Sequence, residues 1–348
     1  MKKVTIYDIA EEANVSVMTV TRAFQKNSVI KPETRSRILE IAQKNGYHPN
    51  SLASRLAQDR LLISVIIENT FTRLTEDLTN GMEVAGTMLK DQKVDLDLHV
   101  ISRQDASAKA MIEEIETAIE KRTRGLIFVM EHYPEQIVEK INEIVDSGLS
   151  VITLINNPPS VKRLFAIQEN EFMIGQVAAE LLMQFIHKGE VAIFIGNESA
   201  DVHKEILKGF RTTLEGSEVD LYKIYDTKED MELSRQMIRQ LLTEKPDIKG
   251  FFISTAKSMA VLREVKAMNM SGKLKIIASD LFPEIVEYIN NGTAQATIFK
   301  NPRQQMIDAV TKLYMNVSGI SDNTEDIYVI PQIIIRSNLN AYLRSKKA

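Results

Sequence analysis

"VTIYDIAEEANVSVMTVTRAF", residues 4–24, is typical of two short helices with a tight turn between them. The first helix places its apolar side chains three or four residues apart on one face, and these are Ile6, Ile9, Ala10 and Ala13. Asn14 tolerates the left-handed backbone conformation that ends a helix, and Ser16 can cap the helix that follows. Two short helices joined in this way predict a helix-turn-helix unit.

A third helix is predicted over "KPETRSRILEIAQKNG", residues 31–46. Pro32 favours the first turn of a helix, and Gly46 can end it. The side chains expected on its buried face are Ile38, Leu39, Ile41 and Ala42. Residues 1–49 are therefore expected to form a small all-α domain built around the helix-turn-helix unit.

The second helix presents an unusual combination of side chains to solvent. Val20 and Phe24 lie four residues apart and share the buried face, so the apolar and basic residues between them point outward. In a DNA major groove, valine and methionine contact thymine methyl groups and arginine binds guanine O6 and N7. The expected base contacts are Val17, Met18 and Arg22, and the expected phosphate contacts are Thr5, Ser16, Thr19, Thr21 and Asn50. The alternative is that Val17 and Met18 pack against a neighbouring domain.

Composition limits the class of protein. A chain of 348 residues with 44% hydrophobic content can form two or three domains. It has no cysteine, no signal peptide and no run of about 18 apolar residues, so we expect a soluble protein of the cytoplasm. Residues 1–60 carry 10 Lys and Arg against 6 Asp and Glu, a net charge of +4, which leaves the remainder with 33 against 41, or −8. A basic head on an acidic body favours contact between the head and a polyanion.

Residues 4–57 resemble the head of the lactose-repressor and galactose-repressor (LacI/GalR) family of transcription regulators, through the stretches quoted above and the "YHPNSLASRLA" that follows them. The resemblance implies a hinge over residues 50–60 that becomes helical on the operator. Leu56 would wedge into the minor groove, and Ala53 and Ala57 would let two hinge helices approach each other. The resemblance also implies a homodimer whose two heads bind a palindromic operator.

The body, residues 61–348, alternates strands with helices, which predicts parallel sheets covered on both faces. "LLISVII", "VDLDLHVIS", "GLIFVM" and "SVITLI" would form one sheet. "LFAIQ", "EVAIFIG", "DLYKIYD", "GFFIST" and "KLKIIASD" would form the other. The pattern resembles the two-lobed periplasmic sugar-binding protein fold, with lobe 1 over about 61–160 and 292–322 and lobe 2 over about 161–291 and 323–348. The chain would cross between the lobes near 157–163, 291–293 and 320–327, and a ligand would lie between them.

Five residues are expected to bind this ligand. Asp280, in "IIASDLFPE", resembles the family's effector-binding aspartate, and Phe71, in "ENTFTRL", resembles an aromatic residue that stacks on a sugar. The alternative for Phe71 is an ordinary core phenylalanine. Elsewhere the chain departs from the family pattern. Lys300 replaces a usual glutamine, Ile206 a sugar-binding arginine, Lys257 an aspartate, and Ile155 and Asn156 an Asp-Arg pair.

The two lysines, Lys257 and Lys300, suit an anionic effector such as a sugar phosphate or a sugar acid. The alternative is that they pair with local carboxylates or point to solvent. Dimer, operator and effector together predict a repressor of carbohydrate-uptake or catabolic genes.

Catalysis is not expected. Asp95 and Asp97 in "DLDLH" alternate as on a strand with one wet face, and the five histidines lack metal-ligand spacing. No nucleotide-binding or zinc-protease motif is present, so we expect neither a cofactor nor a metal. The alternative class is a sugar-binding or enzymatic α/β protein whose helical head docks a protein.

Overall fold

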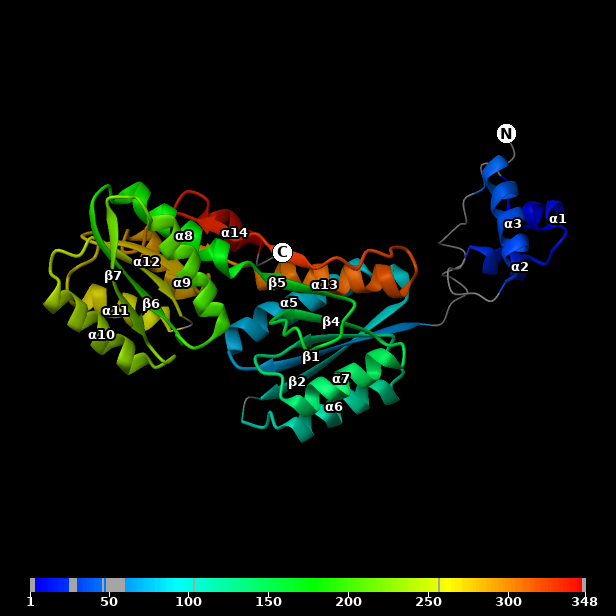
Figure 1. The fold of residues 1–348 in the computed structure, drawn as a ribbon, viewed down its shortest axis with the longest axis horizontal. Helices are drawn as coiled ribbons and strands as arrows, with labels where there is room; N and C mark the ends of the chain where they lie inside the picture. The colour runs from blue at the N-terminus through cyan, green and yellow to red at the C-terminus, as the bar shows by residue number, and fades with distance from the viewer. Residues whose placement is uncertain are drawn as a thin grey trace.

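The computed structural model describes residues 4–24, 30–45, 47, 60–102, 104–255 and 257–345 of the chain. It contains a helical head and a body of two α/β lobes, as the sequence predicts (Figure 1). Asn50, Ala53, Leu56 and Ala57 lie outside the described residues, and so does the side chain of Thr21.

The head contains α1 (Ile6–Glu12), α2 (Val17–Ala23) and α3 (Pro32–Lys44). Asn14 has the expected left-handed conformation, with φ 49°, and the Ser16 Oγ accepts a hydrogen bond from the Thr19 N–H at 3.1 Å. The turn and the cap are therefore confirmed. The buried core contains Ile9, Ala10, Ala13, Val20, Ala23, Ile38, Ala42 and Tyr47.

One predicted core residue of the head is wrong. Leu39 is 39% exposed, whereas Ile38 and Ala42 are buried. Each helical residue turns by about 100°, so a stripe centred on Ile38 and Ala42 leaves Leu39 at its flank.

Lobe 1 is built on a six-stranded parallel sheet with the order β11-β5-β4-β3-β1-β2. Its strands are β1 (Leu61–Asn69), β2 (Val94–Ser102), β3 (Gly125–Val129), β4 (Ser150–Ile155), β5 (Phe165–Glu169) and β11 (Ile327–Val329). One face is covered by α5 (Thr72–Met88) and α13 (Pro302–Val317), and the other by α6 (Ala108–Glu120) and α7 (Glu135–Asp146). A short 3-10 helix, η1 (Lys90–Gln92), precedes β2. Strands buried on both faces explain the continuous apolar runs of β1 and β3.

Lobe 2 repeats this arrangement with the order β12-β10-β9-β8-β6-β7. Its strands are β6 (Gly189–Ile195), β7 (Val219–Asp226), β8 (Gly250–Ser254), β9 (Lys275–Ser279), β10 (Ala296–Phe299) and β12 (Gln332–Ile334), of which β12 runs antiparallel to β10. One face carries α8 (Glu171–Phe185) and α9 (Asp201–Leu214). The other carries α10 (Met231–Glu244), α11 (Ser258–Ala267), α12 (Pro283–Asn290) and α14 (Leu339–Ser345).

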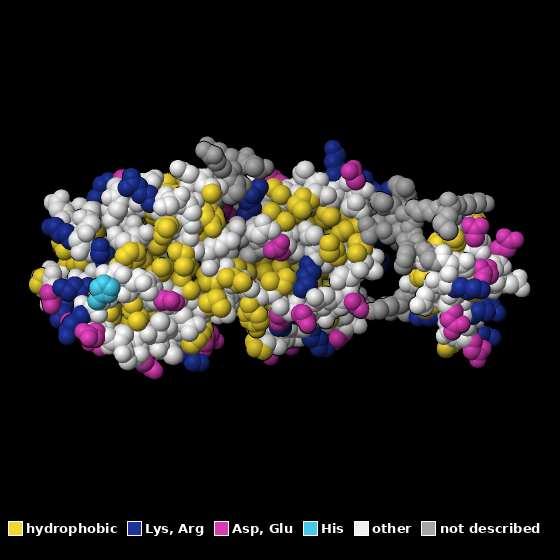
Figure 2. All heavy atoms as spheres, turned by 90° about the horizontal axis from the view of Figure 1, so that it is seen from above, with side chains coloured by type: hydrophobic (Ala, Val, Ile, Leu, Met, Phe, Trp, Pro, Cys, Tyr) yellow, Lys and Arg dark blue, Asp and Glu magenta, His cyan; other side chains and the backbone are white. Residues whose placement is uncertain are grey.

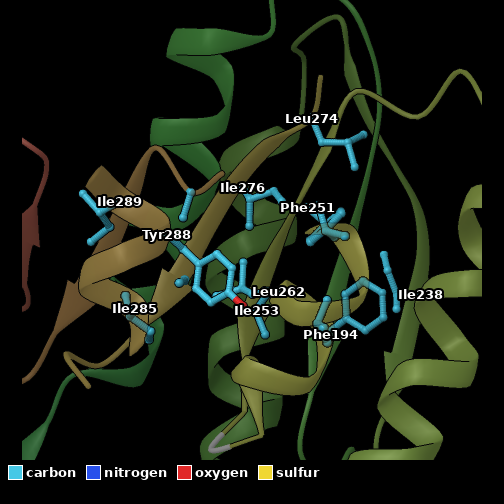
Figure 3. Close-up of a cluster of buried hydrophobic side chains, with 14 of the residues drawn as sticks. Phe194, Ile238, Phe251, Ile253, Leu262, Leu274, Ile276, Ile285, Tyr288 and Ile289 are labelled. Atoms are coloured by element: carbon cyan, nitrogen blue, oxygen red, sulfur yellow. The ribbon is translucent and has the colours of Figure 1, made fainter. Parts of the chain in front are cut away.

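The core under α10, α11 and α12 is rich in aromatic side chains (Figure 3). Phe194 stacks on Tyr225 with ring centroids 4.8 Å apart, and Phe251 meets the same Phe194 edge to face at 5.3 Å. On the opposite face, α8 and α9 pack unusually closely at Gly175 and Gly209. A Cβ added to Gly175 would lie 2.0 Å from the Ile206 carbonyl oxygen, so this contact requires glycine.

The predicted lobe boundaries are wrong at all three crossings. "LFAIQ" forms β5, which pairs with β4 and β11 in lobe 1, and not with the second sheet. β10 belongs to lobe 2 and β11 to lobe 1, so the chain crosses after β5, after β10 and after β11. A short apolar strand has the same pattern in either sheet, and only the pairing partner decides where it lies.

The third crossing exposes several apolar side chains, which are Tyr328, Ile330, Ile333 and Ile335. Figure 2 shows hydrophobic side chains in a band that extends over both lobes on the face seen from above. Within the described part of the chain, no helix combines the length and apolar character that a membrane span requires.

Candidate functional site

A cleft of about 310 Å³ lies between the two lobes. Its walls come from residues that follow the carboxyl ends of strands in both sheets, such as Phe71 after β1, Asn156 after β4 and Asp280 after β9. The carboxyl ends of parallel strands meet at one edge of a sheet, where α/β proteins bind ligands. The volume lies at the lower end of the range for small-molecule sites.

All five residues predicted to bind an effector line this cleft, namely Phe71, Asn156, Lys257, Asp280 and Lys300. Each is half-buried. The Asn156 Nδ2 donates a hydrogen bond to the Glu131 carbonyl oxygen at 2.7 Å, which fixes the position of the amide. The fold therefore brings together residues that are up to 229 positions apart in sequence.

Two aromatic side chains meet across the cleft. Phe71, at the start of α5 in lobe 1, packs edge to face on Phe282, at the start of α12 in lobe 2, with ring centroids 5.3 Å apart. The Lys257 Nζ lies 5.8 Å from the centroid of the Phe71 ring, at cation–π distance. Phe71 is therefore a wall of the cleft and not an ordinary core residue.

Lys300 bridges two carboxylates. Its Nζ lies 3.2 Å from the Glu169 Oε2 of lobe 1 and 3.5 Å from the Asp280 Oδ1 of lobe 2. Burial alone lowers the pKa of Lys300, but the neighbouring carboxylates of Asp280 and Glu169 outweigh it and raise the pKa. The ammonium group is thus engaged by the protein, as the alternative interpretation of this lysine predicts.

Carboxylates of the cleft are the functional candidates that the sequence analysis missed. Beside Asp280, the described lining contains Asp77, Glu131, Glu169, Glu171 and Glu229. Six carboxyl groups thus face two lysines, which disfavours an anionic effector. Glu169 and Glu171 are two residues apart, but the other four carboxyl groups come from separate segments of the chain, so no spacing in the sequence connects the whole set.

Burial perturbs the titration of several groups in the cleft. It raises the pKa of Glu171 to about 7, although a hydrogen bond from the backbone of Glu171 itself lowers it in part. Burial likewise raises the pKa of Glu169 and lowers the pKa of His203. At neutral pH, Glu171 is therefore only partly ionised.

Three cleft residues have left-handed backbone conformations. Ile155 has φ 72°, Asp280 φ 66° and Glu229 φ 52°. For a β-branched residue such as Ile155 this conformation is strained, and strained residues concentrate at functional sites. Glu229 is also held by the Thr255 hydroxyl, which donates to its Oε2 at 3.0 Å.

On the head, α2 presents Met18 and Arg22 to solvent as predicted, with Met18 63% exposed. Val17 differs, because it is half-buried and packs against the core of the head. Thr5 caps α1 by a mutual hydrogen-bonded arrangement with Asp8, and the Ser16 and Thr19 hydroxyls lie 2.8 Å apart. The hydroxyls of Thr5 and Ser16 thus accept hydrogen bonds from backbone N–H groups at the starts of α1 and α2.

Tyr7, which the sequence analysis did not single out, is 71% exposed on α1. Tyr7 lies beside the apolar face of α1 and not on it, and this position in the sequence could have predicted its exposure. Among the described residues, no group of three or more His, Asp and Glu side chains is arranged to hold a metal ion.

Comparison with known proteins identifies both parts of the chain. A family model described as "Periplasmic binding protein domain" matches residues 63–321, and one described as "Bacterial regulatory proteins, lacI family" matches residues 5–50.

Three individual proteins illustrate the similarity. Catabolite control protein A from Staphylococcus xylosus is 29% identical over 249 residues, which cover 70% of this chain and 72% of the relative. Its namesake from Priestia megaterium is 26% identical over 283 residues, covering 80% and 82%. A sugar-binding protein of a sugar ABC transporter from Bacillus halodurans has a TM-score of 0.70 and 21% identity, covering 81% of this chain and 99% of that one, which shows the fold alone.

The chain is thus a DNA-binding regulatory protein and not an enzyme, as the sequence predicts. It belongs to the lacI family of bacterial regulatory proteins, in which a helix-turn-helix head over residues 5–50 precedes a periplasmic binding protein domain over residues 63–321.

Proposed function

We propose that this regulator acts in the cytoplasm as a homodimeric repressor of carbohydrate-uptake or catabolic genes. Its two heads bind a palindromic operator, and a sugar or sugar derivative in the cleft sets its operator affinity. The names of its relatives support control of catabolism, since they are catabolite control proteins. A fold shared with a sugar-binding protein supports the ligand class.

The observation that carries the proposal is the cleft itself, whose walls belong to both lobes. Phe71 offers an aromatic face, and Asn156 and Asp280 offer polar groups, so that a polyhydroxylated ring can stack and form hydrogen bonds. A ligand that touches both lobes binds the closed state more tightly than the open one, and therefore shifts the equilibrium toward closure. Closure of the cleft would shift the two hinge segments of the dimer relative to each other and so alter operator affinity.

Arg22→Ala tests the DNA-binding surface. The variant should lose about 1–3 kcal/mol of operator binding and relax specificity at one base pair, because arginine reads guanine by two hydrogen bonds. Competition binding to operators with single substitutions measures both effects, and Arg37→Ala, which removes an exposed charge from α3, is the matched control. An equal loss on every sequence would make Arg22 a phosphate contact. Binding of the wild-type chain without sequence preference or salt dependence would overturn DNA recognition by the head.

Asp280→Asn tests the cleft. Asparagine tolerates the left-handed conformation of this position, so the fold should be kept. The variant should lose the response of operator binding to the effector while its operator affinity without effector stays unchanged, because the charged hydrogen-bond acceptor is gone. Fluorescence anisotropy on operator DNA measures both quantities, with Asp220→Asn on β7 as an exposed control. An unchanged response would remove Asp280 from the effector site.

A further inference from the structure

The charges of the cleft are not balanced. Among the described residues that line it, six carry carboxyl groups and two carry ammonium groups. Lys300 is shared between Glu169 and Asp280, and Lys257 faces the Phe71 ring. Neither lysine forms an ion pair with Glu171 or Glu229.

Two of these carboxylates, Glu171 and Glu229, lie on one wall of lobe 2. A Cβ on Gly175 would meet the Ile206 carbonyl at 2.0 Å, so the start of α8, which carries Glu171, lies against the first turns of α9. A Cβ on Gly196 would meet both the Glu229 Oε1, at 1.7 Å, and the His203 Cε1, at 3.0 Å. Glu229 therefore lies beside His203 of α9, and Glu171 lies one turn before the contact between α8 and α9.

The described α9 residues that line this wall of the cleft are Val202, His203 and Ile206, and none of them is a lysine or an arginine. Ile206 is apolar and buried, and burial lowers the pKa of His203, which disfavours the charged form of the imidazole. Neither Glu171 nor Glu229 forms an ion pair with a described residue, and the partner of Glu229 is the neutral Thr255 hydroxyl.

The raised pKa of Glu171 shows that its surroundings disfavour a negative charge. Glu171 is the first residue of α8, where helix N–H groups favour a negative charge. Burial is nevertheless the main cause that raises its pKa to about 7. Repulsion by Glu169 and Glu205 adds to this shift, and Lys300 compensates only in part. A positive charge delivered by a ligand would relieve this repulsion.

The aromatic part of the cleft lining already accommodates an ammonium group. The Lys257 Nζ lies 5.8 Å from the Phe71 ring centroid, and Phe282 packs beside that ring. Aromatic faces attract cations, most strongly where water is excluded. A cleft lined by both aromatic rings and carboxylates is a suitable environment for a ligand that is both polyhydroxylated and cationic.

We infer that the effector carries a protonated amine in addition to its hydroxyl groups, as an amino sugar does, and that its ammonium group binds the Glu171 and Glu229 wall. The inference rests on the proposed function, since it names the chemical class of the effector in the same cleft. The hydroxyls would use the remaining polar groups, including Asn156 and Asp280.

Isothermal titration of the full-length chain at about pH 7 tests this inference. The probes are D-glucosamine, D-galactosamine and D-mannosamine, each compared with its parent hexose, from which it differs by one amino group. At least one amine should bind about tenfold or more tightly than its parent, as expected for a hydrogen bond to a charged group.

Glu171→Gln and Glu229→Gln keep the shape of the side chain and remove its charge. Each should reduce the affinity for the preferred amine about tenfold and leave the affinity for the parent hexose within about twofold. Glu215→Gln, at the exposed end of α9, is the matched control and should change neither affinity. The unchanged hexose affinity shows that the variants are folded.

The outcomes separate the inference from the proposed function. Hexoses that bind as tightly as the amines overturn the inference and leave a sugar-controlled regulator. A preference for the amine that remains in a protein with both Glu171→Gln and Glu229→Gln also overturns the inference, because the ammonium group then binds elsewhere. If none of the six probes binds, both the amine and the sugar effector are rejected.

Discussion

Gly175→Ala should destabilise lobe 2 by about 3 kcal/mol. The new Cβ would lie 2.0 Å from the Ile206 carbonyl oxygen and 2.8 Å from the Phe210 backbone nitrogen, and neither backbone atom can move without displacing α9. The helix propensity of alanine offsets only about 1 kcal/mol of this cost. Because Glu171 lies one turn from Gly175, the same displacement should also weaken effector binding.

Thermal and urea unfolding of the purified chain measure the effect. Gly86→Ala is the matched control, since Gly86 also lies within a helix but its Cβ would meet only a Leu96 methyl group at 3.3 Å. There the propensity gain should dominate, and the variant should be as stable as the wild type or more stable by up to about 1 kcal/mol. If both variants shifted stability in the same direction and by the same amount, the close α8–α9 contact would not be what requires glycine at position 175.

Glu171→Gln should stabilise the protein at pH 8 and leave its stability nearly unchanged at pH 4.5. The pKa of Glu171 is raised from 4.5 to about 7 in the folded protein, with burial as the main cause. The folded state therefore holds this proton more tightly than the unfolded state. The free energy of unfolding falls as the pH rises from 4.5 to 7, by up to about 3 kcal/mol, and stays constant above. Glutamine cannot ionise and avoids this loss.

The difference in urea-unfolding free energy between variant and wild type, measured from pH 4.5 to 8, isolates this group from the others that titrate. The charged groups that act on Glu171 are Glu169, Lys300 and Glu205, and all of them are present in both proteins. Glu215→Gln, which alters an exposed side chain, should give no pH-dependent difference. A difference for Glu171→Gln that is the same at every pH would show that the folded protein does not raise the pKa of this carboxyl.

Local chemistry explains which parts of the fold were predictable. Asn14, Ser16 and Pro32 end or begin helices through interactions with residues at most four positions away. The alternation of strands and helices likewise follows from the apolar period of each segment. Asp280 and Asn156 were expected in the cleft from the resemblance to the family, and they lie there because residues that follow parallel strands converge at one edge of the sheet.

The errors have a common cause. Leu39 and Val17 each lie at the border of an apolar face, where the neighbouring helix decides whether a side chain is covered. The strand over Phe165–Glu169 has the same pattern in either sheet, and its pairing with β4 and β11 placed it in lobe 1. The hypothesis of an anionic effector stays a prediction, which the six carboxyl groups around Lys257 and Lys300 disfavour.

By itself, the sequence determined the helix-turn-helix head, the two-lobed α/β body and the family, because helix ends, apolar periods and motifs depend on residues close together in the chain. Only the tertiary structure decided the character of the cleft. Glu169 and Glu171 flank the connection between β5 and α8, whereas Glu229 follows β7 and Asp280 follows β9, and only the fold brings all four into one cleft. Coulomb interactions and burial depend on distances that exist only after both lobes have folded, so the acidic character of the cleft follows from the fold.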